Sequence, residues 1–169
     1  ECSALDHFTG GNGHIAAYLT EQVLTTLPED IQSFLIRTSI FERFSPELAD
    51  TVTMRRDSLD VMRRLEPLKA LIMPSGTRDW YRYHHLFAEC LQDHLRRRFA
   101  DEVRGLHGRA SAWFAEQGDV VEAVKHARAA GDYDRCALLV EQAGGWELIL
   151  FGGIGYLRNL LHNIPQSLL

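Results

Sequence analysis

In the first part of the chain, hydrophobic residues recur every three or four positions, which is the spacing of one face of an α-helix. One such stripe predicts a helix that begins near His14. Pro28, in a first-turn position and followed by two acids, predicts a second helix. Ser45 and Asp57 have side chains typical of N-terminal caps and predict a third and a fourth. The residues expected to face inward on these helices are Ile15, Leu19, Val23, Ile31, Phe34, Leu35, Leu59, Met62 and Leu65.

The pattern changes between residues 71 and 84. A short apolar run at 71–73 and an alternating aromatic and polar run at 80–84 flank a turn-rich segment, which together predict a β-hairpin. Helices followed by a hairpin are the order of a winged-helix domain, which we expect over residues 28–100. A helix should follow the hairpin, with an inner side formed by Leu86, Phe87, Cys90, Leu91, His94 and Leu95.

A different repeat begins near residue 101. Gly118-Asp119, Gly131-Asp132 and Gly144-Gly145 recur every thirteen residues, and the segments between them have the length and composition of helices. Each glycine can end one helix and each aspartate can cap the next, as in an alpha-solenoid. Large and small residues suited to pairing these helices are Trp113, Phe114, Ala123 and Ala127. The predicted fold is mainly α: a winged-helix domain with a short β-hairpin, followed by TPR-like antiparallel helix pairs over residues 101–169.

Composition narrows the classes of function. A formal net charge of −5 argues against nucleic-acid binding driven by charge alone. No apolar run approaches the roughly 20 residues that span a bilayer, so we expect no membrane partner. Three widely spaced cysteines, Cys2, Cys90 and Cys136, form no CxxC pair and indicate reduced thiols in the cytoplasm. The abrupt ends of the sequence lead us to expect a piece of a longer protein.

The candidate binding site lies in residues 80–87, where four aromatic rings, one arginine and two histidines occur together. We predict that His84 or His85, with Arg82, contacts a phosphate, because the start of a helix favours an anion. The alternative is that one imidazole packs and the other caps the following helix.

Other candidates are weaker. The glycine-rich loop at 10–13 lacks the Lys-Ser/Thr ending of a phosphate-binding loop. His85, Cys90 and His94 lack a fourth zinc ligand at suitable spacing; the alternative is a packed Cys90 beside a half-exposed His94. The arginine pairs and triplet are expected on solvated surfaces rather than on nucleic-acid phosphates. They occupy positions 55–56, 63–64 and 96–98. We find no catalytic motif and predict no enzyme activity for this chain.

Several blocks resemble MalT-type transcription regulators, the large ATP-binding members of the LuxR family within the STAND class of P-loop ATPases. The similar blocks are Phe8-Thr9-Gly10, 14–19, 21–24, Pro28-Glu29-Asp30, 34–40, 80–87 and parts of 110–132. The resemblance implies that residues 1–27 are a linker and a helix from a preceding ATPase module. It implies that ADP or ATP binds the full-length parent, and that His84 or His85 contacts the nucleotide phosphate.

The resemblance also implies that the chain acts in signal transduction, by coupling the nucleotide state of the ATPase core to the helical sensor arm. ADP would hold an inactive monomer, and an inducer on the helical arm, with ATP, would promote self-association and transcription. The partner of this chain would be the neighbouring ATPase domain, and the chain would bind no DNA itself. One departure is Asn12-Gly13-His14, where the family often has an arginine. The alternatives are the same module in a bacterial serine/threonine protein kinase, a wing that binds DNA directly, or a metal-dependent enzyme.

Overall fold

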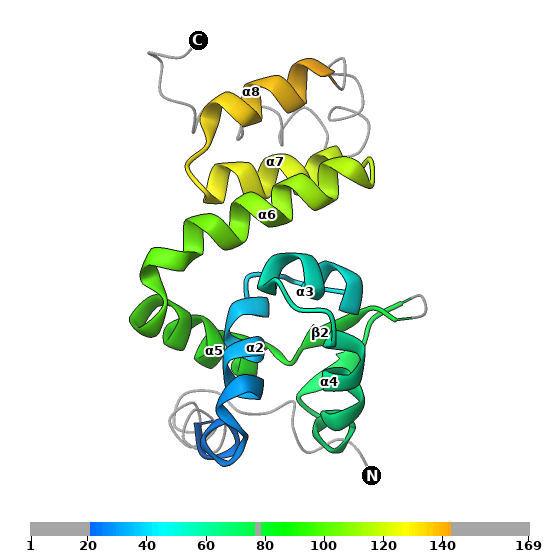
Figure 1. Cartoon of the computed structure of the whole chain (residues 1–169), viewed down its shortest axis with the longest axis vertical. Helices are drawn as coiled ribbons and strands as arrows, with labels where there is room; N and C mark the ends of the chain where they lie inside the picture. The colour runs from blue at the N-terminus through cyan, green and yellow to red at the C-terminus, as the bar shows by residue number, and fades with distance from the viewer. Residues whose placement is uncertain (1–20, 77–78, 143–169) are drawn as a thin grey trace. The chain divides into compact units, whose positions relative to one another are not determined.

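The computed structural model describes residues 21–76 and 79–142 (Figure 1). The chain divides between Ala100 and Asp101 into two compact units. Both contain fully buried hydrophobic residues, such as Leu35 in the first and Leu106 in the second. Among the described residues, no helix has the length and hydrophobicity needed to cross a membrane.

The first unit contains the second, third and fourth helices that the sequence predicts. The predicted start of the first helix near His14, with Ile15 and Leu19, lies outside the described residues. Val23 was expected to face inward and is half-buried, and its neighbour Leu24 is buried instead. Residues 21–26 are helical, and α2 (Glu29–Thr38), α3 (Pro46–Thr53) and α4 (Ser58–Arg64) follow. Pro28 stands one residue before its predicted place, at the N-cap of α2. The hydroxyl of Ser45 accepts a hydrogen bond from the backbone amide of Leu48, 3.2 Å away, so Ser45 caps α3 as predicted.

Helix α4 differs from the prediction in two respects. Asp57 occupies the N-cap position but makes no capping hydrogen bond, because its carboxylate binds the Arg55 guanidinium at 2.7 Å. Leu59 was expected to face inward and is 43% exposed. The buried stripe starts instead from Ser58 and continues at helical spacing, and Leu59 falls outside it. Its members are Ser58, Val61, Met62 and Leu65.

A two-stranded antiparallel hairpin follows a 3-10 turn (Glu66–Leu68). Strands β1 (Ile72–Pro74) and β2 (Tyr81–Tyr83) pair so that Ile72 lies opposite Tyr83. Phe44, between α2 and α3, extends the pairing through two backbone hydrogen bonds of 2.8 Å with Tyr81. The hairpin is therefore joined by its second strand to the helical part of the unit.

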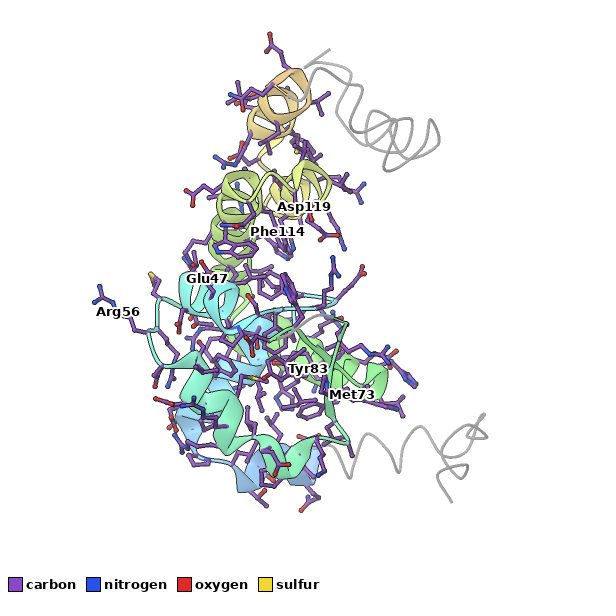
Figure 2. The ribbon with its side chains drawn as sticks, turned by 90° about the vertical axis from the view of Figure 1, so that its right-hand side faces the viewer. Glu47, Arg56, Met73, Tyr83, Phe114 and Asp119 are labelled. Atoms are coloured by element: carbon purple, nitrogen blue, oxygen red, sulfur yellow. The ribbon has the colours of Figure 1, made fainter. Side chains whose placement is uncertain are left out.

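Helix α5 (His85–Arg98) completes this unit, and the order of three helices, a hairpin and a further helix is that of a winged helix. The core-facing residues of α5 are Phe87, Leu91 and Leu95. Leu86, Cys90 and His94 were expected on the same side and are only half-buried. Tyr83 projects into the packed interior (Figure 2), where it lies beside Phe44 and Phe87 with ring-centroid distances of 5.1 and 5.8 Å.

The second unit follows the 3-10 turn at Ala100–Glu102 and contains α6 (Val103–Glu116), α7 (Val120–Ala129) and α8 (Tyr133–Gln142). Gly118 and Gly131 have φ angles of +77° and +72°, which end α6 and α7 in the left-handed region. Asp119 and Asp132 then accept backbone amide hydrogen bonds at 3.1 and 3.0 Å and cap the next helices. The predicted Gly-Asp punctuation is confirmed for both pairs. Gly144-Gly145 lies outside the described residues.

Helix α7 packs against both α6 and α8. Ala123 and Ala127 are fully buried on α7, and Trp113 and Phe114 are buried on α6, as the pairing of large with small residues predicted. The structure is thus mainly helical with one short hairpin. That this unit is the beginning of a TPR-like arm stays a prediction, because the continuation lies outside the described residues.

Candidate functional site

The predicted phosphate-binding residues lie where β2 leads into α5. Arg82 is the middle residue of β2 and is exposed. His84 follows the strand and occupies the N-cap of α5, and His85 is the first residue of the helix. Because strand side chains alternate between the two faces, Arg82 points away from the core into which Tyr83 is packed. One corner of the winged helix therefore carries all three residues.

Backbone hydrogen bonds hold His84 through both its amide and its carbonyl group. Its amide donates to the carbonyl of Leu71 at 2.8 Å, and its carbonyl accepts from the amide of Ala88 at 2.9 Å. The His84 imidazole makes no capping hydrogen bond to α5. Its side chain is half-buried, whereas His85 is exposed. The cap role weighed from the sequence is therefore not filled by His84, and neither imidazole is sealed beneath hydrophobic side chains.

The two imidazoles are neighbours, with ring centroids 4.4 Å apart and planes inclined by 33°. Burial lowers the pKa of His84 from its ordinary value of 6.5, and the charges of His85 and Arg82 lower this pKa further. A neutral His84 ring has one nitrogen that donates a hydrogen bond and one that accepts. An anion placed against these groups would act in the opposite direction and raise the pKa of His84.

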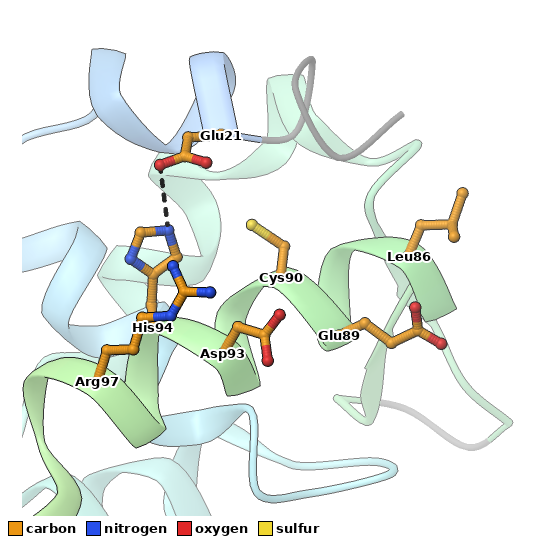
Figure 3. Close-up of a pocket in the computed structure, with 7 residues that line it drawn as sticks. All are labelled: Glu21, Leu86, Glu89, Cys90, Asp93, His94 and Arg97. Atoms are coloured by element: carbon orange, nitrogen blue, oxygen red, sulfur yellow. Dashed lines mark ion pairs between the residues drawn. The ribbon is translucent and has the colours of Figure 1, made fainter. Parts of the chain in front are cut away.

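A second feature of α5 is a pocket of about 310 Å³ between this helix and Glu21 (Figure 3). His94 Nε2 lies 3.7 Å from a carboxylate oxygen of Glu21 across this pocket. Burial and the neighbouring carboxylates of Glu21 and Asp93 raise the pKa of the Cys90 thiol, which leaves less of it as the nucleophilic thiolate. The lining residues are Glu21, Leu86, Glu89, Cys90, Asp93, His94 and Arg97.

The structure does not bring the three candidate metal ligands together. Cys90 and His94 line the pocket, and His85 is not among its lining residues. Within residues 21–76 and 79–142, no group of three or more His, Cys, Asp or Glu side chains has an arrangement that would hold a metal ion. The glycine-rich loop at 10–13 and the departure at 12–14 lie outside these described ranges.

Each predicted arginine run contains ion pairs with nearby carboxylates. Arg55 binds Asp57, and both Arg55 and Arg64 lie 3.8 Å from Asp30. Further pairs join Arg63 to Asp60, Arg96 to Asp93 and Arg98 to Glu29. Arg56 is exposed and projects away from the ribbon (Figure 2). These arginines lie on surfaces of mixed charge rather than on a continuous basic face.

The pairing of His107 with His126 was not predicted from the sequence. Their Nδ1 atoms lie 2.7 Å apart, between α6 and α7. The two residues are nineteen positions apart, so their meeting depends on the register in which the helices pack. A histidine at a helical core position on each of two consecutive helices was the available signal.

Comparison with known proteins assigns part of this chain to a family. The model described as MalT winged helix domain matches residues 20–103. The HTH-type transcriptional regulator MalT of Vibrio parahaemolyticus is 27% identical over 159 residues, which cover 94% of this chain and 18% of that protein. The MalT of Vibrio cholerae is 28% identical over 166 residues, or 96% of the chain and 18% of the relative.

A second kind of relative is the serine/threonine-protein kinase PknK of Mycobacterium tuberculosis H37Rv. It is 38% identical over 136 residues, which are 79% of this chain and 12% of the kinase. The chain therefore spans less than a fifth of the length of these relatives. Residues 20–103 belong to the MalT winged-helix domain family, and the chain is homologous over most of its length to MalT regulators and PknK kinases.

Proposed function

We propose that this chain is a regulatory region of a MalT-like, ATP-dependent transcriptional activator of the LuxR family. The winged helix couples the nucleotide state of a neighbouring ATPase module, in the same cytoplasmic protein, to a helical sensor arm. An inducer on that arm and self-association of the parent complete the response. The chain itself carries out no catalytic step and binds no DNA.

The observation that carries this proposal is the gathering of Arg82, His84 and His85 at the start of α5. The first amides of an α-helix have no partner within the helix, and the helix dipole is positive there. The amide of His84 is bonded to Leu71, so a phosphate would meet the amides that follow it. Guanidinium, imidazole and amide donors are the groups that bind phosphate oxygens. These residues fit an ADP or ATP phosphate held mainly by the ATPase module.

Of the two histidines, we assign the phosphate contact to His84. Backbone hydrogen bonds on both sides fix its position, and its ring is half-buried. His85 is exposed and has more conformational freedom. A fixed donor loses less entropy when it binds, so His84 suits a contact that reports the nucleotide state.

The test uses the full-length protein. His84→Ala and His85→Ala are each purified, the bound nucleotide is released and quantified, and basal transcription is measured from a reporter. We expect His84→Ala to lose ADP and to raise basal transcription, and His85→Ala to have a smaller effect. His84→Gln retains a hydrogen-bond donor and should keep part of the ADP.

His94→Ala is the matched control, since His94 is a half-buried histidine on the same helix that lines the pocket in Figure 3. Its ADP content and basal transcription should equal those of the unaltered protein. If His84→Ala and His85→Ala both behave like this control, the phosphate contact is not made by this corner of the domain.

The second candidate is the same regulatory region in a serine/threonine kinase. The 38% identity to PknK, against 27–28% to the two MalT proteins, favours it. The sequence that precedes Glu1 in the parent distinguishes the two: a kinase domain supports this candidate, and an ATPase module alone supports the first. The role of His84 is the same in both.

Direct DNA binding is the third candidate. The ion pairs that join the arginines to nearby carboxylates disfavour it. A labelled duplex titrated with this chain at low and high salt tests it. We expect no shift of the duplex. A shift that weakens steeply with salt would show phosphate contacts and would replace the coupling proposal with DNA binding.

A further inference from the structure

Two histidines that the proposed function does not use meet inside the second unit. His107 on α6 and His126 on α7 have Nδ1 atoms 2.7 Å apart and ring centroids 5.0 Å apart. The ring of His126 also lies nearly parallel to that of Phe114, at 8° and 5.4 Å. His126 is 1% exposed. The pair therefore lies in the interface between α6 and α7.

The geometry favours one placement of the protons on the two rings. A hydrogen bond between two Nδ1 atoms requires one ring to donate and the other to accept. On its other side, His126 Nε2 lies 3.8 Å from a carboxylate oxygen of Glu122, which favours a proton on Nε2. His126 then has an unprotonated Nδ1 that accepts the hydrogen bond. In that arrangement His107 holds its proton on Nδ1 and donates it.

Charged and titratable groups surround the pair. On α7, Lys125 is paired with Glu122 at 3.3 Å. On α8, the Cys136 thiol contacts the carbonyl of Val124, and burial raises its pKa, so this thiol does not titrate in acid. Burial first and the charge of Lys125 second lower the pKa of His107 to about 4. Burial, then His107, then Lys125 lower the pKa of His126 to about 3.

We propose that His107 and His126 form a proton-sensitive clasp, a neutral imidazole pair with fixed tautomers that holds α6 against α7 and opens when both rings are protonated. The first proton adds to Nε2 of His107, which leaves the Nδ1 hydrogen bond in place. The second proton adds to Nδ1 of His126. It removes the acceptor and leaves two cations in contact.

The first test needs no substitution. Long-range ¹H–¹⁵N spectra of the 169-residue chain, recorded from pH 8 downward, report the tautomer and the titration of each imidazole. We expect a proton on Nδ1 of His107 and on Nε2 of His126 at pH 8. His107 should titrate first, and both should titrate below 6.5. A proton on Nε2 of both rings at pH 8, or titration of either ring at or above 6.5, would overturn the clasp.

The second test measures the effect of the histidine pair on the stability of the folded chain. The unfolded chain binds protons at these sites below pH 6.5 and the folded chain does not, so the folding equilibrium weakens as the pH falls towards 4. Each ring contributes up to about a tenfold change in the equilibrium constant per pH unit. In the double variant His107→Phe/His126→Phe, the urea midpoint followed by far-UV circular dichroism should lose this part of its pH dependence. His94→Phe, in the other unit, should keep it.

An unchanged pH dependence in the double variant contradicts the proposal. If this variant does not fold, the tautomers and the order of titration in the unaltered chain decide whether the proposal holds. Neither experiment involves nucleotide, so both results are independent of the role proposed for His84.

Discussion

The hydroxyl oxygens of Thr38 and Tyr83 lie 2.6 Å apart in the core of the winged helix, and the position of the donor can be deduced. Thr38 Oγ1 also lies 2.8 Å from the carbonyl oxygen of Phe34, which can only accept a hydrogen bond. The single hydroxyl proton of Thr38 is used there. Tyr83 must therefore donate to Thr38, and this bond fixes β2 to α2 one residue before His84.

We expect substitutions of the two partners to be unequal in effect. Tyr83→Phe removes the donor and leaves Thr38 still bonded to Phe34, with an expected loss of about 0.5–1.5 kcal/mol in the free energy of unfolding. Thr38→Val removes the acceptor and leaves the fully buried Tyr83 hydroxyl without a partner, with an expected loss of about 1–3 kcal/mol. Urea unfolding of the purified chain measures both.

Tyr81→Phe is the control for this comparison, since Tyr81 lies on the same strand and is only half-buried. Its effect should stay within about 0.5 kcal/mol. Equal losses in Thr38→Val and Tyr83→Phe would show that the donor assignment is wrong.

The second prediction concerns the pKa of His84. Removal of the Arg82 charge in Arg82→Ala should move this pKa upward, towards 6.5, because Arg82 is one of the groups that lower it. Since the pKa of His84 is lower in the folded chain than in the unfolded chain, its contribution to stability is present above pH 6.5 and declines as the pH falls. NMR titration of the imidazole gives the values directly. A downward shift in Arg82→Ala would show that Arg82 does not act on His84 through charge.

The hairpin and its following helix were predictable because aromatic and polar residues alternate over 80–84 and then change to helical spacing. The cap role of Asp57 was not borne out, because capping and ion pairing compete for one carboxylate. Arg55, two residues earlier, reaches that carboxylate at 2.7 Å. A residue type suited to a cap predicts the start of a helix, but it does not predict the partner of the side chain.

The candidate site, too, was only partly predictable from the sequence. Local sequence was enough to place Arg82, His84 and His85 together, because they are contiguous at a strand–helix junction. It was not enough to separate the half-buried His84 from the exposed His85, which depends on how α5 packs. The His107–His126 contact depends on the register of two helices, and no local pattern encodes that register.

The third prediction concerns two glycines of the second unit. Gly118 ends α6 with a φ of +77°, and a side chain in this left-handed region is unfavourable by about 1–2 kcal/mol. Gly118→Ala should therefore destabilise the chain by about this amount. Gly108 lies inside α6, and a Cβ atom there would meet no heavy atom within 4 Å. Gly108→Ala should raise stability by about 0.5–1 kcal/mol. Thermal unfolding followed by far-UV circular dichroism compares the two, and a loss of stability in both would contradict the conformational explanation.

The last prediction separates two leucines that the sequence placed in the core. Leu91 on α5 is fully buried, whereas Leu59 on α4 is 43% exposed. Leu91→Ala should lower the free energy of unfolding by about 2–5 kcal/mol, since it removes buried methyl groups and leaves a cavity. Leu59→Ala removes a side chain that already contacts water, so its effect should be within about 0.5 kcal/mol.

Urea unfolding of both leucine variants, each with unaltered far-UV circular dichroism at zero denaturant, provides the comparison. The two side chains are identical and both lie on helices of the winged helix, so helix propensity contributes equally to the two substitutions. The difference between them then measures burial alone. If Leu59→Ala were as destabilising as Leu91→Ala, Leu59 would be packed inward, and α4 would be rotated relative to the stripe of Ser58, Val61, Met62 and Leu65.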